Sequence, residues 1–266
     1  MDLGLRGKRA LVTGSTGGIG LATARQLAAE GCTVVVNGRT TARVEDAARR
    51  VREAAGVAAD AVRGVAADLG TAEGCAALCA AVPDVDVLVN NVGIFEPKPF
   101  GEIPDADWLR FFETNVLSGV RLARHYLPGM RERDWGRIVF VSSESAVQIP
   151  AEMIHYGMTK TAQVAVARGL AETTAGTGVT VNSVLPGPTA SEGVSTFVGQ
   201  MAAAQGVDFA TAEREFFATA RPSSLLRRFA TPDEVAAMIA YACSGRAAAT
   251  NGAALRVDGG VVRAVL

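Results

Sequence analysis

Short apolar runs alternate with longer alanine-rich or amphipathic segments along the whole chain of 266 residues. The apolar runs are rich in valine and are bounded by glycine, asparagine or serine, a pattern that predicts buried strands. They lie at positions 9–13, 33–37, 61–66, 85–89, 138–141, 179–185 and 253–257. Strands that alternate with helices from end to end imply a parallel sheet covered by helices on both faces.

The segments between the apolar runs predict helices. We expect helices at 21–30, at 41–55, from about 71, from 105 to about 126, around 156–160, and from 231 to about 244. Thr231-Pro232-Asp233-Glu234 indicates a helix start, with a capping residue, proline at the first position and acidic residues in the first turn. Pro128 is interpreted as weakening the long helix that begins at Asp105. The fold class is therefore α/β, a doubly wound parallel sheet of seven strands in a single domain spanning residues 1–266.

The composition bounds the possible partners. The hydrophobic share of 49% supports a large core, and a net charge of −1 gives no electrostatic case for nucleic acid or an anionic membrane surface. The chain has no apolar stretch of membrane-spanning length, and the residues after Met1 lack the apolar core of a secretory signal. We therefore expect a cytoplasmic protein whose partner is a small molecule.

The cysteines do not indicate a metal site. Cys32, Cys75, Cys79 and Cys243 are scattered, and no histidine or second cysteine pair lies near them in the sequence to complete a zinc site. We interpret them as small buried residues and predict no metal.

A glycine-rich turn connects the first predicted strand to the first predicted helix. It reads Gly14-Ser15-Thr16-Gly17-Gly18-Ile19-Gly20, and a strand, glycine turn and helix in this order are the context of a dinucleotide fingerprint. Glycines let the backbone approach a pyrophosphate, and the amides at the helix start receive its charge. The predicted cofactor contacts are Gly14, Ser15, Thr16, Gly18, Ile19 and Gly20.

The end of the second strand bears on the choice of cofactor. An acidic residue there would accept a hydrogen bond from the ribose 2′-hydroxyl of NAD, but the chain has Asn37, followed by Arg39. A guanidinium suits a 2′-phosphate, so Arg39 favours NADP, although it is alternatively a solvated loop residue and NAD stays possible. Asp68, before Leu69, is expected either to bind the adenine amino group or to cap the helix that begins near Thr71.

Further polar residues follow the later strands. Asn90 is expected to tie the central strands together through their backbones, and Gly93 to let a cofactor come close beside Asn91. Asn115 falls among apolar neighbours inside a predicted helix, so its amide is either a structural bridge or part of a proton path. The sixth strand ends in Pro186-Gly187-Pro188-Thr189, a rigid turn predicted to lie over the nicotinamide.

The chain's candidate chemistry lies at Ser143, Tyr156 and Lys160. Tyr156 and Lys160 are four residues apart, so on a helix their side chains are adjacent. A lysine cation within about 4–6 Å of a phenol favours the phenolate and lowers the tyrosine pKa, so that the tyrosine can exchange a proton with a carbonyl or an alcohol. Ser143 follows the buried run 138–141, at the strand end where ligands bind in an open α/β sheet. Taken alone, a Tyr-x-x-x-Lys pair is more often a solvated helix face.

Taken together, the motifs resemble those of the short-chain dehydrogenase/reductase family, in its short single-domain form, over nearly the whole chain. They are Thr13 to Gly20, Asn90-Asn91-Val92-Gly93, Asn115, Ser143, Tyr156-x-x-x-Lys160, Pro186-Gly187 and Asp258-Gly259-Gly260. The resemblance implies a Rossmann-type fold and a homotetramer or homodimer. It also implies that Tyr156 is the general acid/base, that Lys160 lowers its pKa and binds the nicotinamide ribose, that Ser143 holds the substrate oxygen, and that Asn115 holds a water linking Lys160 to solvent.

Three departures from the family pattern matter. Many relatives that use NADP carry a basic residue where this chain has Gly17, which leaves Arg39 to support NADP. Val92 replaces the usual alanine, a packing variation. The hydroxyl just past Pro-Gly is displaced, so either Thr189 or Ser191 is expected to meet the nicotinamide carboxamide.

The substrate is the least determined feature. Glu144 and Glu152 lie near Ser143, and our hypothesis is that one of them faces the pocket and favours a polar or cationic substrate, the alternative being a solvated or salt-bridged loop acid. The segment 191–220, with Phe197, Met201, Phe209, Phe216 and Phe217, is expected to be a lid.

Three hypotheses about function follow from these residues. The first is an NADP-dependent oxidoreductase that interconverts a ketone or aldehyde, possibly a 3-oxoacyl compound, and its alcohol. The second is an NAD-dependent alcohol, sugar or steroid dehydrogenase. The third, a non-catalytic dinucleotide sensor, is disfavoured because it would not need the proton-transfer residues.

Overall fold

The computed structural model describes residues 2–191, 194, 198–199, 202–203 and 206–265. Within these residues, seven strands form one sheet in the order β3-β2-β1-β4-β5-β6-β7, and every neighbouring pair is parallel. The strands are β1 (Arg9–Val12), β2 (Thr33–Gly38), β3 (Val62–Ala66), β4 (Val87–Asn90), β5 (Gly136–Val141), β6 (Val179–Pro186) and β7 (Ala254–Val257). The predicted doubly wound parallel sheet is confirmed.

The strand order reverses at β1. The chain runs outward from β1 through β2 to β3, and then returns to place β4 on the other side of β1, with Leu11 opposite both Val35 and Leu88. The loops that leave β1 and β4 therefore diverge and open a crevice at the carboxyl ends of the strands, where open α/β sheets bind ligands.

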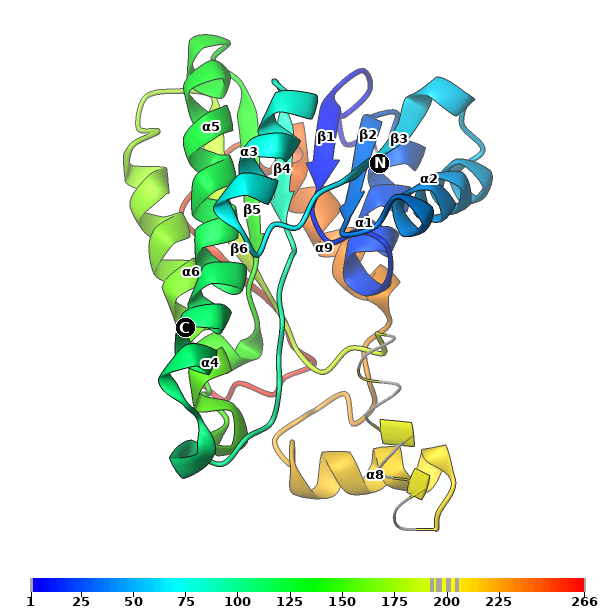
Figure 1. The fold of residues 1–266 in the computed structure, drawn as a ribbon, viewed down its shortest axis with the longest axis vertical. Helices are drawn as coiled ribbons and strands as arrows, with labels where there is room; N and C mark the ends of the chain where they lie inside the picture. Colours follow the sequence, from blue (N-terminus) through cyan, green and yellow to red (C-terminus); the bar gives the residue numbers. More distant parts are fainter. Residues whose placement is uncertain (1, 192–193, 195–197, 200–201, 204–205, 266) are drawn as a thin grey trace.

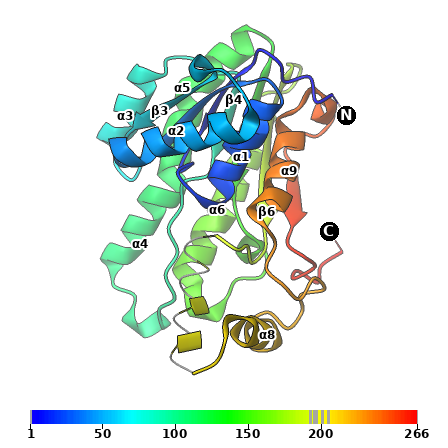
Figure 2. The ribbon, with the colours of Figure 1, turned by 90° about the vertical axis from the view of Figure 1, so that its right-hand side faces the viewer.

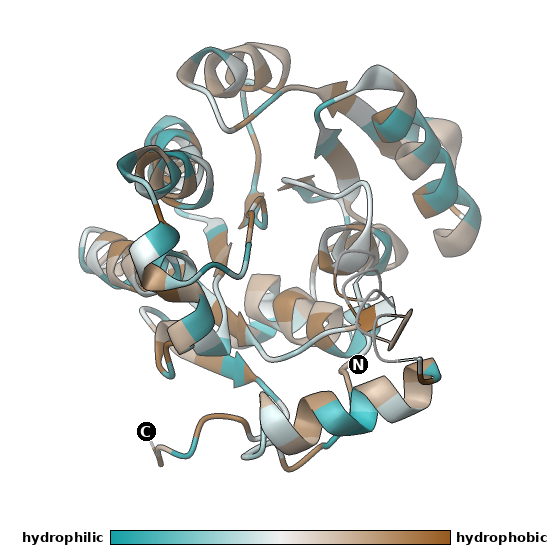
Figure 3. Cartoon of the chain, turned by 60° about the horizontal axis from the view of Figure 1, so that its bottom comes forward, coloured by the Kyte–Doolittle hydropathy of each residue, from teal (hydrophilic) through white to brown (hydrophobic). Residues whose placement is uncertain are grey.

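Helices cover both faces of the sheet (Figure 1). α1, α2 and α9 pack over one face around Leu27, Val51 and Ile239, while α3, α5 and α6 pack over the other around Leu78 and Leu122. Each outer helix carries both hydrophilic and hydrophobic residues, as expected when one side faces the sheet and the other faces solvent (Figure 3). The helices are α1 (Gly18–Ala29), α2 (Thr41–Ala55), α3 (Ala72–Ala81), α4 (Asp105–Phe112), α5 (Ser118–Glu132), α6 (Ile154–Glu172), α8 (Phe209–Thr219) and α9 (Pro232–Cys243).

The long helix expected from Asp105 to about Tyr126 is different in the structure. It is divided into α4 and α5 by a π-helical turn at Glu113–Leu117, and α5 continues to Glu132 with Pro128 inside it. Proline lacks an N–H group, so it removes one helical hydrogen bond, but the helix tolerates this loss because it is packed against the sheet. The prediction that the helix weakens at Pro128 is wrong.

The segment after β6 leads to α8, which lies beyond the carboxyl-terminal edge of the sheet (Figure 2). Asp208 caps α8 by accepting a hydrogen bond from the Thr211 N–H at 2.7 Å. Phe217 and Phe229 form a small separate core with Phe216 packed against it, so α8 has its own apolar contacts. Phe197 and Met201 of the predicted lid lie outside the described residues.

Two further findings concern the described part of the chain only. None of its helices combines the length and apolar character needed to cross a membrane. It also contains no cluster of three or more histidine, cysteine or acidic side chains placed to hold a metal ion, and its four cysteines are all free thiols.

Candidate active site

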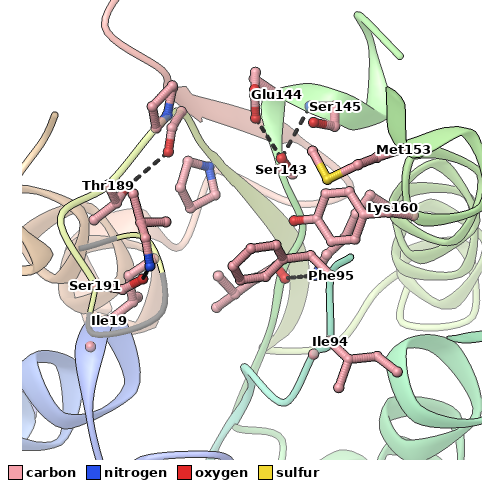
Figure 4. A pocket seen from close by; sticks show the side chains of 18 of the residues that line it. Ile19, Ile94, Phe95, Ser143, Glu144, Ser145, Met153, Lys160, Thr189 and Ser191 are labelled. Carbon is pink, nitrogen blue, oxygen red and sulfur yellow. Dashed lines mark hydrogen bonds between the residues drawn. The ribbon is translucent and has the colours of Figure 1, made fainter. Parts of the chain in front are cut away.

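A cavity of about 1010 Å³ lies at the carboxyl ends of the strands, between the glycine turn, α6 and the end of α8 (Figure 4). It brings together most of the predicted site residues from segments far apart in the sequence. Those that line it are Gly14, Gly18, Ile19, Gly20, Arg39, Asn91, Gly93, Ser143, Tyr156, Lys160, Pro186, Gly187 and Thr189. Six predicted site residues do not line the cavity: Ser15, Thr16, Asn37, Asp68, Leu69 and Asn115.

The glycine turn is shaped for close approach of a ligand. Gly14 and Gly18 have φ angles of 59° and 52°, in the left-handed region that favours glycine. A Cβ on Gly20 would lie 2.5 Å from the Gly14 carbonyl oxygen, so only glycine fits there. Gly17 precedes α1 without a side-chain cap, which leaves the first amides of this helix for an anion. This turn fits the pyrophosphate of a dinucleotide.

Ser15 and Asn37 hold the glycine turn through their hydrogen bonds and do not line the cavity, and their contact with the cofactor stays a prediction. Ser15 Oγ donates to the Val12 carbonyl at 2.6 Å and accepts from the Asn37 N–H at 2.9 Å. Asn37 Nδ2 donates to two carbonyls at the end of β3, and its Oδ1 accepts from the Gly14 N–H at 3.3 Å. Both side chains are buried, so their polar atoms are committed to backbone groups.

Asp68, Leu69 and Thr16 also lie outside the cavity wall. Asp68 Oδ1 accepts from the Gly70 N–H at 3.0 Å, while the cap of α3 is Thr71, whose hydroxyl oxygen accepts from the Gly74 N–H. The helix-capping alternative for Asp68 is therefore wrong, and its proposed contact with adenine stays a prediction. Leu69 is buried in the core, and Thr16 is half-buried against Gly38.

Asn91, and not Asn90 as predicted, links the ends of the central strands through their backbones. Asn91 Nδ2 donates to the carbonyl oxygens of Thr13 and Gly14 at 2.9 and 3.0 Å, and so ties β4 to the glycine turn. Asn90 is buried, and its amide has no hydrogen-bond partner among the described residues. Successive side chains of a strand point to opposite faces, so only one of the two asparagines reaches the turn.

Arg39 lines the cavity as predicted, and Arg43, which the sequence reasoning missed, lines it as well. Arg43 lies in the first turn of α2, four residues after Arg39, and this proximity was the signal that could have identified it. Two guanidinium groups beside one cavity suit a phosphate group.

Tyr156 and Lys160 lie on α6 with the Lys160 Nζ 5.5 Å from the centre of the Tyr156 ring. Lys160 Nζ donates to the Val141 carbonyl at 3.0 Å and to Gln163 Oε1 at 3.1 Å. Burial lowers the pKa of Lys160 to about 7 and raises the pKa of Tyr156 above its ordinary value. The shift of the Tyr156 pKa is opposite to the one expected from the sequence, because burial and the charge of Glu144 outweigh the hydrogen bond with Ser143 and the charge of Arg221.

Asn115 lies in the π-helical turn and is fully buried. Its side-chain Oδ1 accepts from the Ile94 N–H at 2.8 Å. Its Nδ2 donates to the Ile94 carbonyl and to Thr159 Oγ1, each at 3.0 Å. Its main-chain carbonyl accepts from Gln163 Nε2 at 2.5 Å. Gln163 therefore joins Asn115 to Lys160, and the water that the family resemblance implies, held by Asn115 and linking Lys160 to solvent, stays a prediction.

Sequence reasoning missed Gln163, although its position three residues after Lys160 places both side chains on one side of α6.

Ser143 lies just past the carboxyl end of β5, and hydrogen bonds join its hydroxyl to Glu144 and Ser145 (Figure 4). Its hydroxyl donates to Glu144 Oε2 at 2.5 Å and accepts from the Ser145 N–H at 3.1 Å. Glu144 Oε1 accepts from Arg221 Nε at 3.2 Å, and Arg221 Nη1 donates to Glu152 at 3.1 Å. Both acids are thus salt-bridged to Arg221. This agrees with the alternative interpretation of these acids as salt-bridged loop residues, and not with the hypothesis that one of them is available to a cationic substrate. Arg221 carried no signal in the sequence.

Comparisons with known proteins agree with this arrangement. Residues 8–201 match the model of the short chain dehydrogenase family. An uncharacterized oxidoreductase of Bacillus subtilis, YvaG, is 48% identical over the full length of both chains. D-beta-hydroxybutyrate dehydrogenase of Cupriavidus necator is 34% identical over 97% of this chain and 99% of its own. The crystal structure of L-sorbose reductase from Gluconobacter frateurii, complexed with NADPH and L-sorbose, superposes with a TM-score of 0.93 at 34% identity, covering 100% of both chains.

Proposed function

The chain belongs to the short-chain dehydrogenase family of oxidoreductases, and we propose that it uses NADP to interconvert a ketone or aldehyde and the corresponding alcohol. The observation that carries this proposal is the single cavity in which Ser143, Tyr156 and Lys160 meet the glycine turn. A dinucleotide site and a proton-transfer site within one cavity suit hydride transfer coupled to proton transfer.

In this proposal the chain's own residues manage the substrate oxygen and its proton. Ser143 contacts the substrate oxygen, and Tyr156 donates its phenolic proton to that oxygen as the carbonyl is reduced to the alcohol. When bound, NADPH supplies the hydride that is added to the carbonyl carbon. The Lys160 cation stabilises the tyrosinate that remains. Burial raises the pKa of Tyr156, which keeps the phenol protonated near neutrality and ready to act as an acid.

The residues around the cavity fit NADP. The glycine turn and the start of α1 would hold the pyrophosphate, and Arg39 and Arg43 would hold the 2′-phosphate. Pro186, Gly187 and Thr189 would lie by the nicotinamide. The L-sorbose reductase relative binds NADPH, which supports the same assignment here, and NAD is the alternative cofactor.

The substrate end of the cavity combines apolar and polar side chains. Phe95 and Met153 line it together with Glu144, Glu152 and Arg221. The apolar residues suit a 3-oxoacyl-type compound. The polar cluster favours a second candidate, a polyhydroxylated ketone such as a sugar, and the L-sorbose reductase relative supports that candidate.

The proposal is tested by following NADPH absorbance with a panel of ethyl 3-oxobutanoate, L-sorbose and simple aldehydes. We expect turnover of at least one compound, and a fall of about a hundredfold or more in kcat for Tyr156→Phe, because a positioned proton donor contributes that much. NADH in place of NADPH separates the two cofactors. Tight dinucleotide binding without turnover of any compound would instead support the non-catalytic sensor.

A further inference from the structure

Glu144 places a carboxylate deep in the candidate site, directly beside Ser143. Its side chain is 7% exposed, and its partner Arg221, in the segment after α8, is 11% exposed. A buried carboxylate beside a catalytic hydroxyl is not required to bind a carbonyl oxygen, which is itself an acceptor. Its presence therefore calls for a physical explanation.

The hydrogen bonds of Ser143 suggest one. A hydroxyl has one hydrogen and two acceptor lone pairs. The hydrogen is directed at Glu144 Oε2 at 2.5 Å, and one lone pair accepts from the Ser145 N–H at 3.1 Å. The one remaining lone pair faces the Tyr156 phenol, which also interacts with Ser143, and can accept a hydrogen bond from an alcohol. While its hydrogen is on Glu144, the hydroxyl cannot donate to a ketone.

The arrangement depends on a carboxylate at position 144. Ser143 donates to one oxygen and Arg221 Nε donates to the other at 3.2 Å, and only a carboxylate presents two acceptors in this way. Arg221 also bonds Glu152, whose side chain is 50% exposed, and the Ala220 carbonyl at 2.8 Å. The arginine is therefore fixed at several points and holds Glu144 in place.

We propose that Glu144 is a positioning residue for the reaction proposed above: held by Arg221, it directs the Ser143 hydrogen away from the substrate and favours the alcohol over the carbonyl compound in the site. This inference rests on the proposed function. Arg221 connects the segment after α8 to the catalytic serine, so the end of the predicted lid and the substrate-binding hydroxyl are mechanically linked.

The substitution Glu144→Gln reverses the direction of the hydrogen bond. A glutamine has one oxygen and one NH₂ group, and the Arg221 guanidinium retains the oxygen. The NH₂ group then donates to Ser143, whose hydrogen becomes available to a ketone. We expect the ratio of KM for the alcohol to KM for the ketone to rise roughly tenfold, the change produced by one hydrogen bond between neutral groups. The pair to measure is ethyl 3-hydroxybutanoate and ethyl 3-oxobutanoate.

A second readout needs no substrate. The charged groups that face Tyr156 are Lys160 on the same helix, Glu144, and Arg221. The charge of Glu144 raises the pKa of Tyr156 and that of Arg221 lowers it. In ultraviolet titration with Tyr156→Phe subtracted, the midpoint is extrapolated from the onset of tyrosinate absorbance in the folded protein. Glu144→Gln should move this midpoint down and Arg221→Met should move it up.

Glu132→Gln is the matched control, because Glu132 is exposed at the end of α5 and does not line the cavity. It should leave both the KM ratio and the titration midpoint where they are in the wild type. Thermal melts establish that each variant is folded.

The outcomes separate the inference from the proposed function. Turnover by the wild type with an unchanged KM ratio in Glu144→Gln, or equal effects of Glu144→Gln and Glu132→Gln, would overturn the inference alone. If the wild type turns over no compound, the proposed function fails, and the titration decides by itself: an unmoved midpoint in Glu144→Gln overturns the role assigned to Glu144.

Discussion

At the scale of single residues, the proposed preference for NADPH over NADH depends on the two arginines beside the glycine turn. Arg39 and Arg43 both line the cavity, and only NADPH offers them a 2′-phosphate. We expect Arg39→Ala and Arg43→Ala each to raise KM for NADPH roughly tenfold and to leave KM for NADH nearly unchanged. Steady-state kinetics with both cofactors measures this difference.

Arg50→Ala is the control, because Arg50 is exposed on the outer side of α2 and pairs with Asp46. Equal losses with NADPH and NADH would contradict a contact with the 2′-phosphate, since the remainder of the two cofactors is the same.

Lys160 is the second residue with a measurable signature. Burial lowers its pKa to about 7 from 10.5, so between these values the unfolded state binds more protons than the folded state. The contribution of Lys160 to stability therefore increases as the pH rises from about 7 to about 10.5, and below about 7 its burial penalty is constant.

We expect the stability of the wild type, relative to Lys160→Met, to increase across this window, in urea unfolding followed at several pH values. A difference that does not vary with pH would mean that the lysine titrates in the fold as it does in water.

Several residue-scale assignments could not be made from the sequence. Asn90 and Asn91 are adjacent and chemically identical, and which one reaches the glycine turn depends on the pleat of β4. Asn37 stands at the position that contacts the ribose in many dinucleotide sites, but the nearby carbonyls of β3 take up its amide. Sequence predicts which residues gather near a site, whereas hydrogen-bond partners depend on the final packing.

At the scale of elements, the strands were predictable because short apolar runs, most of them rich in valine, alternate with longer helical segments. The helix from Asp105 was harder. Its apolar pattern continues through positions 113–117, where the structure has a π-helical turn. That turn is associated with tertiary contacts of Asn115, to the backbone of Ile94 and to Gln163 on α6, which leave no local sequence signal.

Gln163 joins the π-helical turn to α6, and the strength of this link can be measured. It donates to the Asn115 carbonyl and accepts from Lys160, and it is 1% exposed. We expect Gln163→Ala to lower the free energy of unfolding by about 1–3 kcal/mol, because two buried polar groups lose a partner. Urea unfolding measures the change.

Gln148→Ala is the matched control, because this glutamine is exposed in the loop after β5 and should change stability by less than about 0.5 kcal/mol. An equal effect of the two substitutions would show that the link contributes nothing specific.

At the scale of the whole molecule, the reversal of strand order at β1 determines where the cavity lies. The fold and the general position of the site were therefore predictable from the order of strands, helices and glycine turn. The contribution of Arg221 was not, because it comes from the segment after α8, whose placement against Glu144 and Glu152 depends on charge pairing across 77 and 69 positions of sequence. Long-range ion pairs of this kind leave no periodic pattern.

The assembly is the remaining whole-molecule prediction, and α4 offers a way to test it. Leu109 is 72% exposed and Phe112 is 37% exposed on this helix, and exposed large apolar side chains that lie close together are typical of an interface. We expect a homotetramer or homodimer in light scattering, and the double variant Leu109→Glu with Phe112→Glu should shift the mass toward the monomer, because a buried unpaired carboxylate is costly. Ala54→Glu, on the exposed side of α2, adds the same kind of charge elsewhere and should leave the mass unchanged. A wild-type protein that is monomeric at micromolar concentration would contradict the prediction, and an assembly that survives the double variant would place the interface on another face.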